Sequence, residues 1–323
     1  MENKRLDIVY CPEDLRGIKD DYKVFLAGPI QGSEEWQFNV PVIPGVTWIC
    51  PRRLKYSNFD YNEQVSWEHL GMLVSNIILF WIPSPVFIPS GRSYAQTTRF
   101  ELGECIGRDR HVIVGCSSDI PGRRYFSLKH RGTVHETLED CISELISYIG
   151  NRSPKTFYTS DTHFGHQRTL DLSRRPFKNI KEMDEVMIDR WNNIVGPKDV
   201  VYHLGDFGDS WPIEYLSGDI RLVLGNYERD NKSPIPSGCT IIEPGEYNNY
   251  ILCHEPTKGL EIRGEREDIP ILFGHIHGRQ KLKSWLGMDV GVDSNNYSPV
   301  SSEEVDFFLN AIKKGYYDSD VWC

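Results

Sequence analysis

The sequence predicts two α/β domains, the first of them built on a parallel sheet. With 323 residues the chain is long for a single hydrophobic core, so its length favours two domains. In the first half, short apolar runs alternate with segments of helical composition, which is the pattern of strands buried on both faces of a parallel sheet. A polar stretch with Pro154 then precedes a second series of apolar runs. We therefore predict domains over residues 1–152 and 153–323.

Four apolar runs predict the strands of the N-terminal domain. They are Lys23–Ala27, Val46–Cys50, Asn76–Ile82 and His111–Gly115. Helical composition predicts helices between them, over Asn62–Val74 and Thr97–Ile106. Apolar residues at helical spacing from Leu138 to Ile149 predict a last helix, which Gly150 and Asn151 should end.

The second domain restarts the alternation at Thr156. Its predicted strands are Phe157–Thr159, Val200–Leu204, Ile220–Leu224, Tyr250–Cys253 and Ile271–Phe273. Apolar residues on one face between Met183 and Ile194 predict a helix. Each predicted strand runs directly into residues of the types that bind metals, so the strand ends are where we expect a site.

Composition and charge argue against several classes of protein. The net charge of −10 disfavours binding to extended nucleic acid, which needs a basic surface, but a small phosphorylated substrate stays compatible. The eight cysteines are scattered without a C-x-x-C pair, which argues against a thiolate zinc site and a disulfide framework. The longest apolar run is too short to cross a bilayer, and the N-terminus has no apolar signal-peptide region. We expect a cytoplasmic protein without a membrane partner, in the host cytoplasm if the gene is viral.

Seven side chains that follow the strands of the second domain form a candidate metal-binding set. They are Asp161, His163, Asp206, Asn226, His254, His275 and His277. Carboxylate and amide oxygens mixed with imidazoles suit two close divalent cations. In the D-x-H and H-x-H segments, alternate residues of an extended chain point the same way, so both side chains can serve one site.

In this order, the motifs SDTHFGH, GDFGD, GN, a later histidine and GHIH resemble those of the calcineurin-like metallophosphoesterases, over roughly Phe157 to Pro299. The resemblance implies a β-sandwich flanked by helices, with two divalent ions (Mn²⁺, Fe²⁺, Zn²⁺, Ni²⁺ or Mg²⁺). Such ions lie about 3.5–4 Å apart, activate a water molecule and clamp the phosphoryl oxygens. It also assigns the ligands: Asp161, His163 and His277 to one ion, Asn226, His254 and His275 to the other, and Asp206 as the bridge.

Tyr227 departs from the Gly-Asn-His pattern of this family, in which the histidine helps to protonate the leaving group. A phenol with a pKa near 10 is the weaker acid. Either the leaving group needs little protonation, as a nucleotide phosphate would, or His166 or His203 takes the role; an inactive protein is a third possibility. His166 could also touch substrate.

Two further features lie near this set in the sequence. Asp293 could support the histidines. Arg174 and Arg175 could contact a phosphate, although a solvated turn is the favoured interpretation of these two arginines.

The first half carries a second constellation. FLAGPI and CPRR follow predicted strands, and the segments EQVSWE, a strand ending in FW, and TRFELG come later. In this order they resemble the nucleoside 2-deoxyribosyltransferase-like family, over roughly Lys23 to Gly115. The resemblance implies a flavodoxin-like parallel sheet, and a homo-oligomer in which neighbours complete the pocket. It also implies Glu101 as a nucleophile that attacks the anomeric carbon of the sugar.

Other site residues carried over from this resemblance surround the sugar and the base. Gly28, Pro29 and Gln31 would line the sugar pocket, Glu68 would orient or protonate the base, and Trp67 would pack nearby. Arg52 and Arg53 could hold a 5′-phosphate, with ordinary surface arginines as the alternative. For Glu101 the alternative is a carboxylate at a helix N-terminus, where it would complement the helix dipole.

The function that we expect is a bifunctional nucleotide-metabolising enzyme with a small nucleoside or nucleotide substrate. One domain would cleave or exchange an N-glycosidic bond, and the other would hydrolyse a phosphate mono- or diester. Two alternatives stay open: a metallophosphodiesterase whose N-terminal domain only binds a nucleotide, and a non-catalytic regulatory protein that senses a nucleotide.

Overall fold

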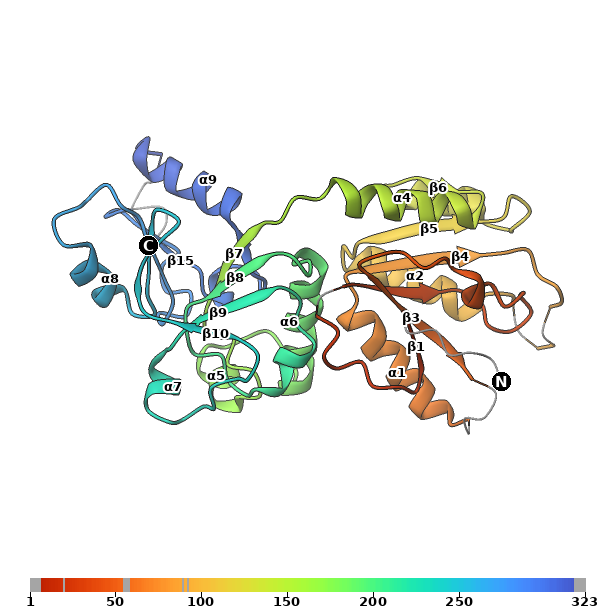
Figure 1. Ribbon diagram of the computed structural model, residues 1–323, viewed down its shortest axis with the longest axis horizontal. Helices are drawn as coiled ribbons and strands as arrows, with labels where there is room; N and C mark the ends of the chain where they lie inside the picture. The colour runs from red at the N-terminus through yellow and green to blue at the C-terminus, as the bar shows by residue number, and fades with distance from the viewer. Residues whose placement is uncertain (1–6, 20, 55–58, 89, 92, 317–323) are drawn as a thin grey trace. The chain divides into compact units, whose positions relative to one another are not determined.

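A computed structural model describes residues 7–19, 21–54, 59–88, 90–91 and 93–316 (Figure 1). The chain forms two compact α/β units, Met1–Ser153 and Pro154–Cys323. In the described part of the chain, no helix combines the length and the apolar character that a membrane span requires. No disulfide joins the cysteines that the structure describes.

The N-terminal unit is built on a six-stranded parallel sheet in the order β1-β3-β2-β4-β5-β6. The strands are β1 (Ile8–Cys11), β2 (Tyr22–Ala27), β3 (Val46–Arg53), β4 (Ile77–Ile82), β5 (Val112–Cys116) and β6 (Val134–His135). Strands β2 and β4 are buried along their whole length, which explains their continuous apolar sequence. The four predicted strands are β2 to β5. The strand order reverses at β2, because β3 lies on one side of it and β4 on the other.

Helices cover both faces of this sheet. They are α1 (Tyr61–Val74), α2 (Gln96–Gly107), α3 (Arg123–Lys129) and α4 (Leu138–Asn151), with a short 3-10 turn at Trp36–Asn39. Cys141 and Leu145 of α4 join the core on one face, while Gly71 of α1 packs against Phe25 on the other. The predicted end of α4 was wrong, because the helix includes Gly150 and Asn151. A glycine costs a helix only about 1 kcal/mol, so it does not by itself end one.

The C-terminal unit contains two five-stranded sheets that share one core. The first, β10-β9-β8-β7-β16, consists of β7 (Thr156–Thr159), β8 (Val200–His203), β9 (Asp219–Val223), β10 (Thr240–Ile242) and β16 (Val300–Ser301). The second, β11-β12-β13-β15-β14, consists of β11 (Gly245–Tyr247), β12 (Tyr250–Leu252), β13 (Ile271–Phe273), β14 (Leu282–Lys283) and β15 (Gly287–Asp289). Tyr158 and Leu204 from the first sheet pack in one cluster with Leu252 and Met288 from the second. The two sheets therefore form a sandwich.

Helices flank this sandwich. They are α5 (Gln167–Leu172), α6 (Ile180–Ile194), α7 (Asn226–Arg229), α8 (Pro256–Arg263) and α9 (Ser302–Lys313), with 3-10 turns at Trp211–Glu214 and Val292–Ser294. Helix α6 is the helix predicted from the apolar face. It begins at an Asn179 side chain that accepts the Glu182 N–H, and it buries Met183, Met187 and Trp191.

Candidate active sites

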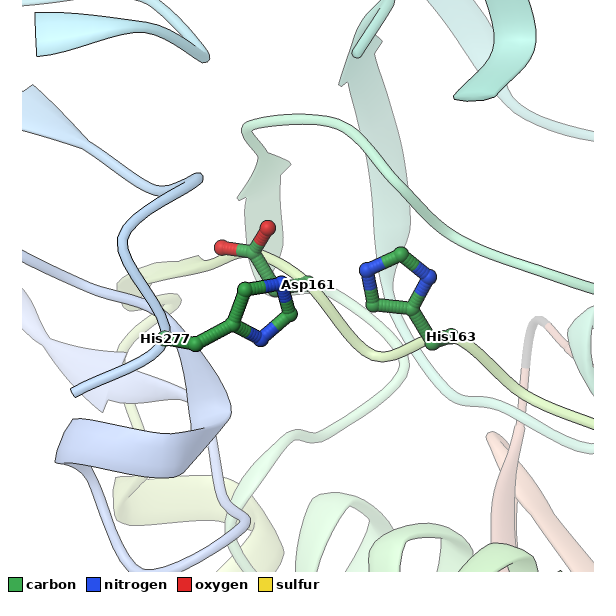
Figure 2. Close-up of side chains that lie close together, drawn as sticks. All are labelled: Asp161, His163 and His277. Carbon is green, nitrogen blue, oxygen red and sulfur yellow. The ribbon is translucent and has the colours of Figure 1, made fainter. Parts of the chain in front are cut away.

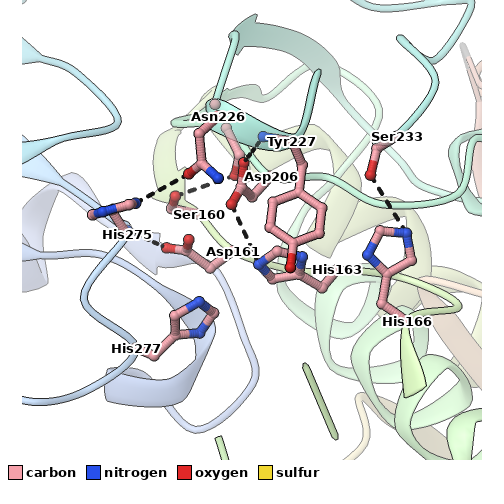
Figure 3. A network of polar contacts seen from close by, with 12 residues as sticks. Ser160, Asp161, His163, His166, Asp206, Asn226, Tyr227, Ser233, His275 and His277 are labelled. Atoms are coloured by element: carbon pink, nitrogen blue, oxygen red, sulfur yellow. Dashed lines mark hydrogen bonds and ion pairs between the residues drawn. The ribbon is translucent and has the colours of Figure 1, made fainter. Parts of the chain in front are cut away.

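The seven side chains proposed as metal ligands come together where the chain leaves the carboxyl ends of strands; Figure 3 labels all of them except His254. Strands β7, β8 and β9 are parallel neighbours and end at one edge of the first sheet, and β12 and β13 end together in the second. The loops supply Asp161 and His163 after β7, Asp206 after β8, Asn226 after β9, His254 after β12, and His275 and His277 after β13.

Two overlapping groups of donor atoms are compact enough to hold a cation each. In the first, donor atoms of Asp161, His163 and His277 all lie within 4.8 Å of one another (Figure 2). In the second, the same is true of Asp161, Asp206 and His254. Asp161 belongs to both groups. The Asp206 Oδ2 atom lies 3.4 Å from His163 Nε2 and 3.5 Å from His254 Nε2, so this carboxylate contacts a histidine of each group.

Asn226 and His275 complete the second group. The Asn226 Oδ1 atom lies 3.0 Å from His254 Nε2 and 3.1 Å from His275 Nδ1. The other ring nitrogen of His254, Nδ1, lies 2.7 Å from the Leu204 carbonyl oxygen. A carbonyl only accepts, so Nδ1 carries the proton, and in the neutral ring the Nε2 lone pair faces the Asn226 oxygen. Two acceptor atoms that face each other repel unless a cation lies between them, so this arrangement fits a bound cation.

Buried polar atoms without partners provide an independent test of metal binding. Asp161 Oδ1 and both ring nitrogens of His163 are buried and lack hydrogen-bond partners among the described residues. Such atoms cost free energy unless a partner satisfies them. Burial also lowers the pKa of His163 well below its ordinary value, so the imidazole is neutral and has a lone pair to donate. The donor set therefore fits divalent cations.

The backbone at the site is held in an unusual conformation. Five of the seven residues have φ in the left-handed region: Asp161 at 56°, His163 at 47°, Asp206 at 56°, His275 at 72° and His277 at 49°. Non-glycine residues adopt this region at a cost of about 1–3 kcal/mol each, and such residues cluster at functional sites. The surrounding contacts must therefore offset this cost.

Glu228, which sequence reasoning missed, holds the Asp206 loop in place. Its carboxylate accepts the backbone N–H groups of Asp206, Phe207 and Gly225 at 2.9, 2.7 and 2.9 Å. Gly225 is required here, because a Cβ at this position would lie 2.2 Å from Asp206 Oδ1. Burial raises the pKa of Asp206 to about 6. The signal that could have found Glu228 is its position three residues after Gly225, which is that of the glutamate in a capping box, although glycine has no side chain to complete the box.

Asp289 was also missed, and it joins the loops that follow β13 and β15. It is completely buried and accepts the N–H groups of Gly278 and Gly291 and the Ser294 hydroxyl. Burial, and next the nearby Asp161 carboxylate, raise its pKa to about 6. No sequence signal separates this aspartate from an ordinary strand-end residue.

The prediction of a solvated turn at Arg175 was wrong. The side chain is buried and pairs with both carboxylate oxygens of Asp293, each at 2.9 Å. Asp293 Oδ2 also lies 2.9 Å from His277 Nδ1, as a supporting residue would. Burial opposes protonation of His277, but the hydrogen bond to Asp293 and the charges of Asp161 and Asp293 together outweigh it and raise the His277 pKa. Arg174, the next residue, is exposed.

Tyr227 and His166 both reach the site. The Tyr227 ring packs edge-on against His163, with ring centroids 4.7 Å apart, and its backbone N–H donates to Asp206 Oδ1 over 2.9 Å. The half-buried His166 ring lies 5.6 Å from the Tyr227 ring, and its Nε2 atom lies 3.4 Å from Ser233 Oγ. Burial lowers the His166 pKa.

His203, the other candidate proton donor, is excluded by its position. It is completely buried, its Nδ1 atom accepts the Gly205 N–H, and its Nε2 atom lies 3.0 Å from Thr162 Oγ1. Burial, and next the nearby His254, lower its pKa to about 3. Without exposed surface or a spare nitrogen, this histidine cannot deliver a proton to a substrate.

The N-terminal unit contains a cavity of about 450 Å³ at the carboxyl ends of β2 and β3. This is the place where the strand order reverses, and open α/β sheets bind ligands at such a point. Of the predicted site residues, the cavity is lined by Gly28, Pro29, Gln31, Arg52, Arg53, Glu68 and Glu101. Trp67 is not among the described lining residues. Its ring is buried, and its Nε1–H donates to the Glu13 carbonyl over 2.7 Å.

Two carboxylates in this cavity have raised pKa values. Burial, followed by repulsion from Glu68 and Glu104, raises the pKa of Glu101 to about 7. Burial also raises the pKa of Glu68, whose Oε1 atom accepts the Gln64 amide over 2.8 Å. The alternative role for Glu101 at a helix N-terminus does not hold, because α2 begins at Gln96 and has no acidic residue in its first turn.

Arg52 and Arg53 are not ordinary surface arginines. The Arg52 guanidinium is buried and donates to Gln37 Oε1 at 2.6 Å and to the carbonyls of Ile30 and Glu34 at 3.3 and 3.0 Å. It therefore supports the loop that follows β2.

Arg53 is likewise bound within the protein. It donates to Gln64 Oε1 at 2.8 Å and to Glu63 Oε2 at 2.6 Å. Both cations of the cavity are thus already occupied by protein acceptors.

Comparisons with known proteins match part of the chain. Residues 21–120 match the sequence profile of the family described as nucleoside 2-deoxyribosyltransferase like. The uncharacterized protein MJ1445 of Methanocaldococcus jannaschii is 33% identical over 180 residues, covering 50% of this chain and 93% of that protein. The gene 66 protein of Mycobacterium phage L5 is 33% identical over 187 residues, covering 43% of this chain and 86% of that protein. The crystal structure of AQ665, a protein of unknown function from Aquifex aeolicus, aligns with a TM-score of 0.41 and 22% identity, over 48% of this chain and 100% of that chain.

Proposed function

This chain belongs to the family of MJ1445 and the phage L5 gene 66 protein, its residues 21–120 form a nucleoside 2-deoxyribosyltransferase-like domain, and we propose that it is a bifunctional nucleotide-metabolising enzyme. Its C-terminal unit would be a dinuclear-metal phosphoesterase of the calcineurin-like type. Its N-terminal unit would cleave or exchange an N-glycosidic bond. The single observation that supports the phosphoesterase is the convergence of seven donor side chains, of which Asp161 and His163 have buried atoms without a hydrogen-bond partner among the described residues.

In the proposed phosphoesterase, one cation would be held by Asp161, His163 and His277, and the other by Asn226, His254 and His275, with Asp206 shared. When bound, the cations would polarise the phosphoryl group and make water a better nucleophile at neutral pH. The chain itself supplies the fixed geometry, because the left-handed loops and their buried hydrogen bonds exist before substrate arrives.

Proton delivery to the leaving group would fall to His166 or Tyr227. His166 is half-buried beside the site, whereas the Tyr227 phenol is a weak acid near neutral pH. A leaving group that is already a good one, such as an aryl oxide or a nucleotide phosphate, needs little protonation. The proposed phosphoesterase should therefore prefer such substrates.

In the proposed glycosidic reaction, the Glu101 carboxylate attacks the anomeric carbon of the sugar, and the electron pair of the broken bond leaves with the base. Glu68 lines the same cavity and would orient the base, which takes up a proton from solvent as it leaves. Water or a second base then attacks the sugar carbon, displaces Glu101 as its carboxylate and gives up a proton to solvent. The product identifies the final acceptor: a free sugar means water, and a new nucleoside means a second base.

The charges of the cavity favour an uncharged sugar substrate. Three carboxylates, Glu35, Glu68 and Glu101, line it, and the guanidinium groups of Arg52 and Arg53 already donate to protein acceptors. A phosphate dianion would find neither an unoccupied cation nor a favourable field there. We therefore expect a nucleoside in this cavity, with phosphoester hydrolysis preceding cleavage of the base.

The experiment is product analysis of deoxynucleosides and their 5′-monophosphates, with Mn²⁺ or with a chelator. With Mn²⁺, the monophosphate should give first the nucleoside and then the free base. With chelator, the monophosphate should stay intact while the nucleoside still releases its base, since a glutamate nucleophile needs no ion. Absence of phosphate release with every divalent ion tested would overturn the phosphoesterase. Base release from the monophosphate in chelator would overturn the order of the two steps.

The same panel tests the alternatives. A wild-type protein that hydrolyses phosphodiesters but never releases a base would be a phosphodiesterase with a nucleotide-binding N-terminal unit. The specific observation that favours a regulatory protein is Tyr227 at the position of the family's histidine. In that case the protein would bind cations and nucleotide but would not turn over even an aryl phosphate.

A further inference from the structure

Arg175 occupies an unusual position for an arginine next to an exposed turn. Its side chain is completely buried, whereas its neighbour Arg174 is exposed. It lies between the loop that carries Asp161 and His163 and the segment that carries Asp293. The loop supplies two donors of the first group, and Asp293 contacts the third donor, His277.

Every N–H bond of the guanidinium group has an acceptor. Nη1 donates to the Thr162 carbonyl at 2.8 Å and to Met183 Sδ at 3.5 Å. Nη2 donates to the Asp161 carbonyl at 2.6 Å and to Asp293 Oδ2 at 2.9 Å, and Nε donates to Asp293 Oδ1 at 2.9 Å. A guanidinium has five such donors in a rigid planar fork, so the geometry of all five partners is fixed at once.

Two of these bonds hold a strained loop. Asp161 and His163 both have positive φ, at 56° and 47°, and the carbonyls of Asp161 and Thr162 lie between these two side chains in the chain. Since the left-handed conformation is unfavourable for both residues, the loop needs contacts that the relaxed conformation would lose. The buried Arg175 side chain supplies two of them.

The other two oxygen contacts orient a histidine. Asp293, fixed by Arg175 on both oxygens, lies with Oδ2 2.9 Å from His277 Nδ1. A proton on Nδ1 leaves the Nε2 lone pair as the atom that can bind a cation. Arg175 thus acts on His277 through Asp293, and on Asp161 and His163 through the backbone.

We propose that Arg175 is a positioning residue that preorganises the Asp161, His163 and His277 group for one of the two cations. The other group shares Asp161 but takes the rest of its support elsewhere, because His254 is oriented by the Leu204 carbonyl and the Asp206 loop by Glu228. Loss of Arg175 should therefore affect one ion more than the other. This inference rests on the proposed metal site. It goes beyond that site because it assigns separate supporting residues to each of the two groups of donor atoms.

The test compares Arg175→Lys with Arg174→Lys, the same change at the adjacent exposed residue. A lysine keeps the charge but cannot bridge two carbonyls and both oxygens of a carboxylate. The measurement is Mn²⁺ binding to the full-length protein by equilibrium dialysis, with EPR spectroscopy to distinguish coupled ion pairs from isolated ions. Thermal unfolding of the ion-free variants shows whether each is folded.

We expect two bound ions and a coupled-pair EPR spectrum for the wild type and for Arg174→Lys. For Arg175→Lys, one ion should bind about 10- to 100-fold more weakly, the range found when groups that orient metal ligands are removed, and the EPR spectrum should become that of isolated Mn²⁺. Asp293→Asn, which keeps the Arg175 contacts to the loop carbonyls, is the second variant, and it should weaken the same ion.

Two results overturn the inference, and they differ from the failure of the proposed function. If Arg175→Lys binds two ions with wild-type affinities, Arg175 does not position the group. If Arg175→Lys does not fold and Asp293→Asn weakens the binding of both ions equally, the two groups of donor atoms do not have separate support. A wild-type protein that binds no ion at all would instead overturn the phosphoesterase proposal itself.

Discussion

The backbone N–H of Tyr227 donates a hydrogen bond to Asp206 Oδ1 over 2.9 Å. The residue that departs from the metallophosphoesterase pattern is thus bonded to the carboxylate that contacts a histidine in each group of donor atoms. The contact uses the backbone, so any residue except proline can make it at this position. The side chain of Tyr227 can therefore change without loss of this support for Asp206, and the two residues can be tested separately.

Asp206→Asn should abolish metal-dependent phosphoester hydrolysis. The amide keeps the size of the side chain and can still accept the Tyr227 N–H, but it removes the shared negative charge. We expect a loss greater than the ~10- to 100-fold typical of residues that only orient ligands. The measurement is Mn²⁺-dependent turnover of an aryl phosphate, with Asp171→Asn on the exposed surface of α5 as the control. Wild-type turnover of Asp206→Asn would refute the site.

Tyr227→His should raise turnover selectively for substrates with poor leaving groups. An imidazolium with a pKa near 6.5 is a better proton donor than a phenol near 10, and general acid catalysis is worth ~10²- to 10⁴-fold. We therefore expect kcat/KM for an alkyl phosphate to rise by about 10-fold or more, and that for a nitrophenyl phosphate to change little. Comparison with Tyr227→Phe shows what the phenol itself contributes. An equal change in kcat/KM for both substrates would mean that proton donation does not cause the change.

Base release by the N-terminal unit should rise with pH through about pH 7. Burial and two neighbouring carboxylates raise the Glu101 pKa to about 7. Below that pH the carboxyl group is protonated and cannot attack, and above it the carboxylate is available. The measurement is base release from a deoxynucleoside across the pH range, followed by chromatography.

Two variants identify the group that titrates. Glu101→Gln should lose base release by about 10³-fold or more, as expected when a covalent nucleophile is removed. Glu104→Gln should stay active with its midpoint at lower pH, because the Glu104 charge is one of those that raise the Glu101 pKa. A midpoint that does not move in Glu104→Gln would assign the titration to another group.

Gly115→Ala should destabilise the N-terminal unit. Gly115 lies in β5 beneath α4, and an added Cβ would lie 2.4 Å from Cys141 Sγ and 2.9 Å from the Trp81 ring. Overpacking a close-packed interior costs about 1–3 kcal/mol in the free energy of unfolding. Gly103→Ala is the matched control, because nothing lies within 4 Å of its Cβ and alanine favours a helix by about 1 kcal/mol. Urea unfolding followed by tryptophan fluorescence measures both, and equal stability of the two variants would contradict the packing.

Strand positions and the nearness of the candidate ligands could be predicted from the sequence because they depend on local patterns. Continuous apolar runs mark strands buried on both faces, and parallel strands bring their carboxyl ends to one edge. A ligand type placed just after each run therefore predicts a shared site. Seven of the described strands were not predicted, since each has only two to four residues, too few to show a period: β1, β6, β10, β11, β14, β15 and β16.

The side-chain contacts could not be predicted in this way, because they are made between distant segments. Arg175 pairs with Asp293, 118 residues further along the chain, and Trp67 donates to Glu13, 54 residues before it. The neighbouring sequence does not distinguish a buried arginine from a solvated one. It also does not distinguish a tryptophan beside the cavity from one that packs away from it. The sequence by itself determined the strands that lead into the candidate ligands, the order of those ligands and the two family resemblances. Only the tertiary structure decided which polar groups are buried and what they bond, because burial depends on segments that meet only in the folded chain.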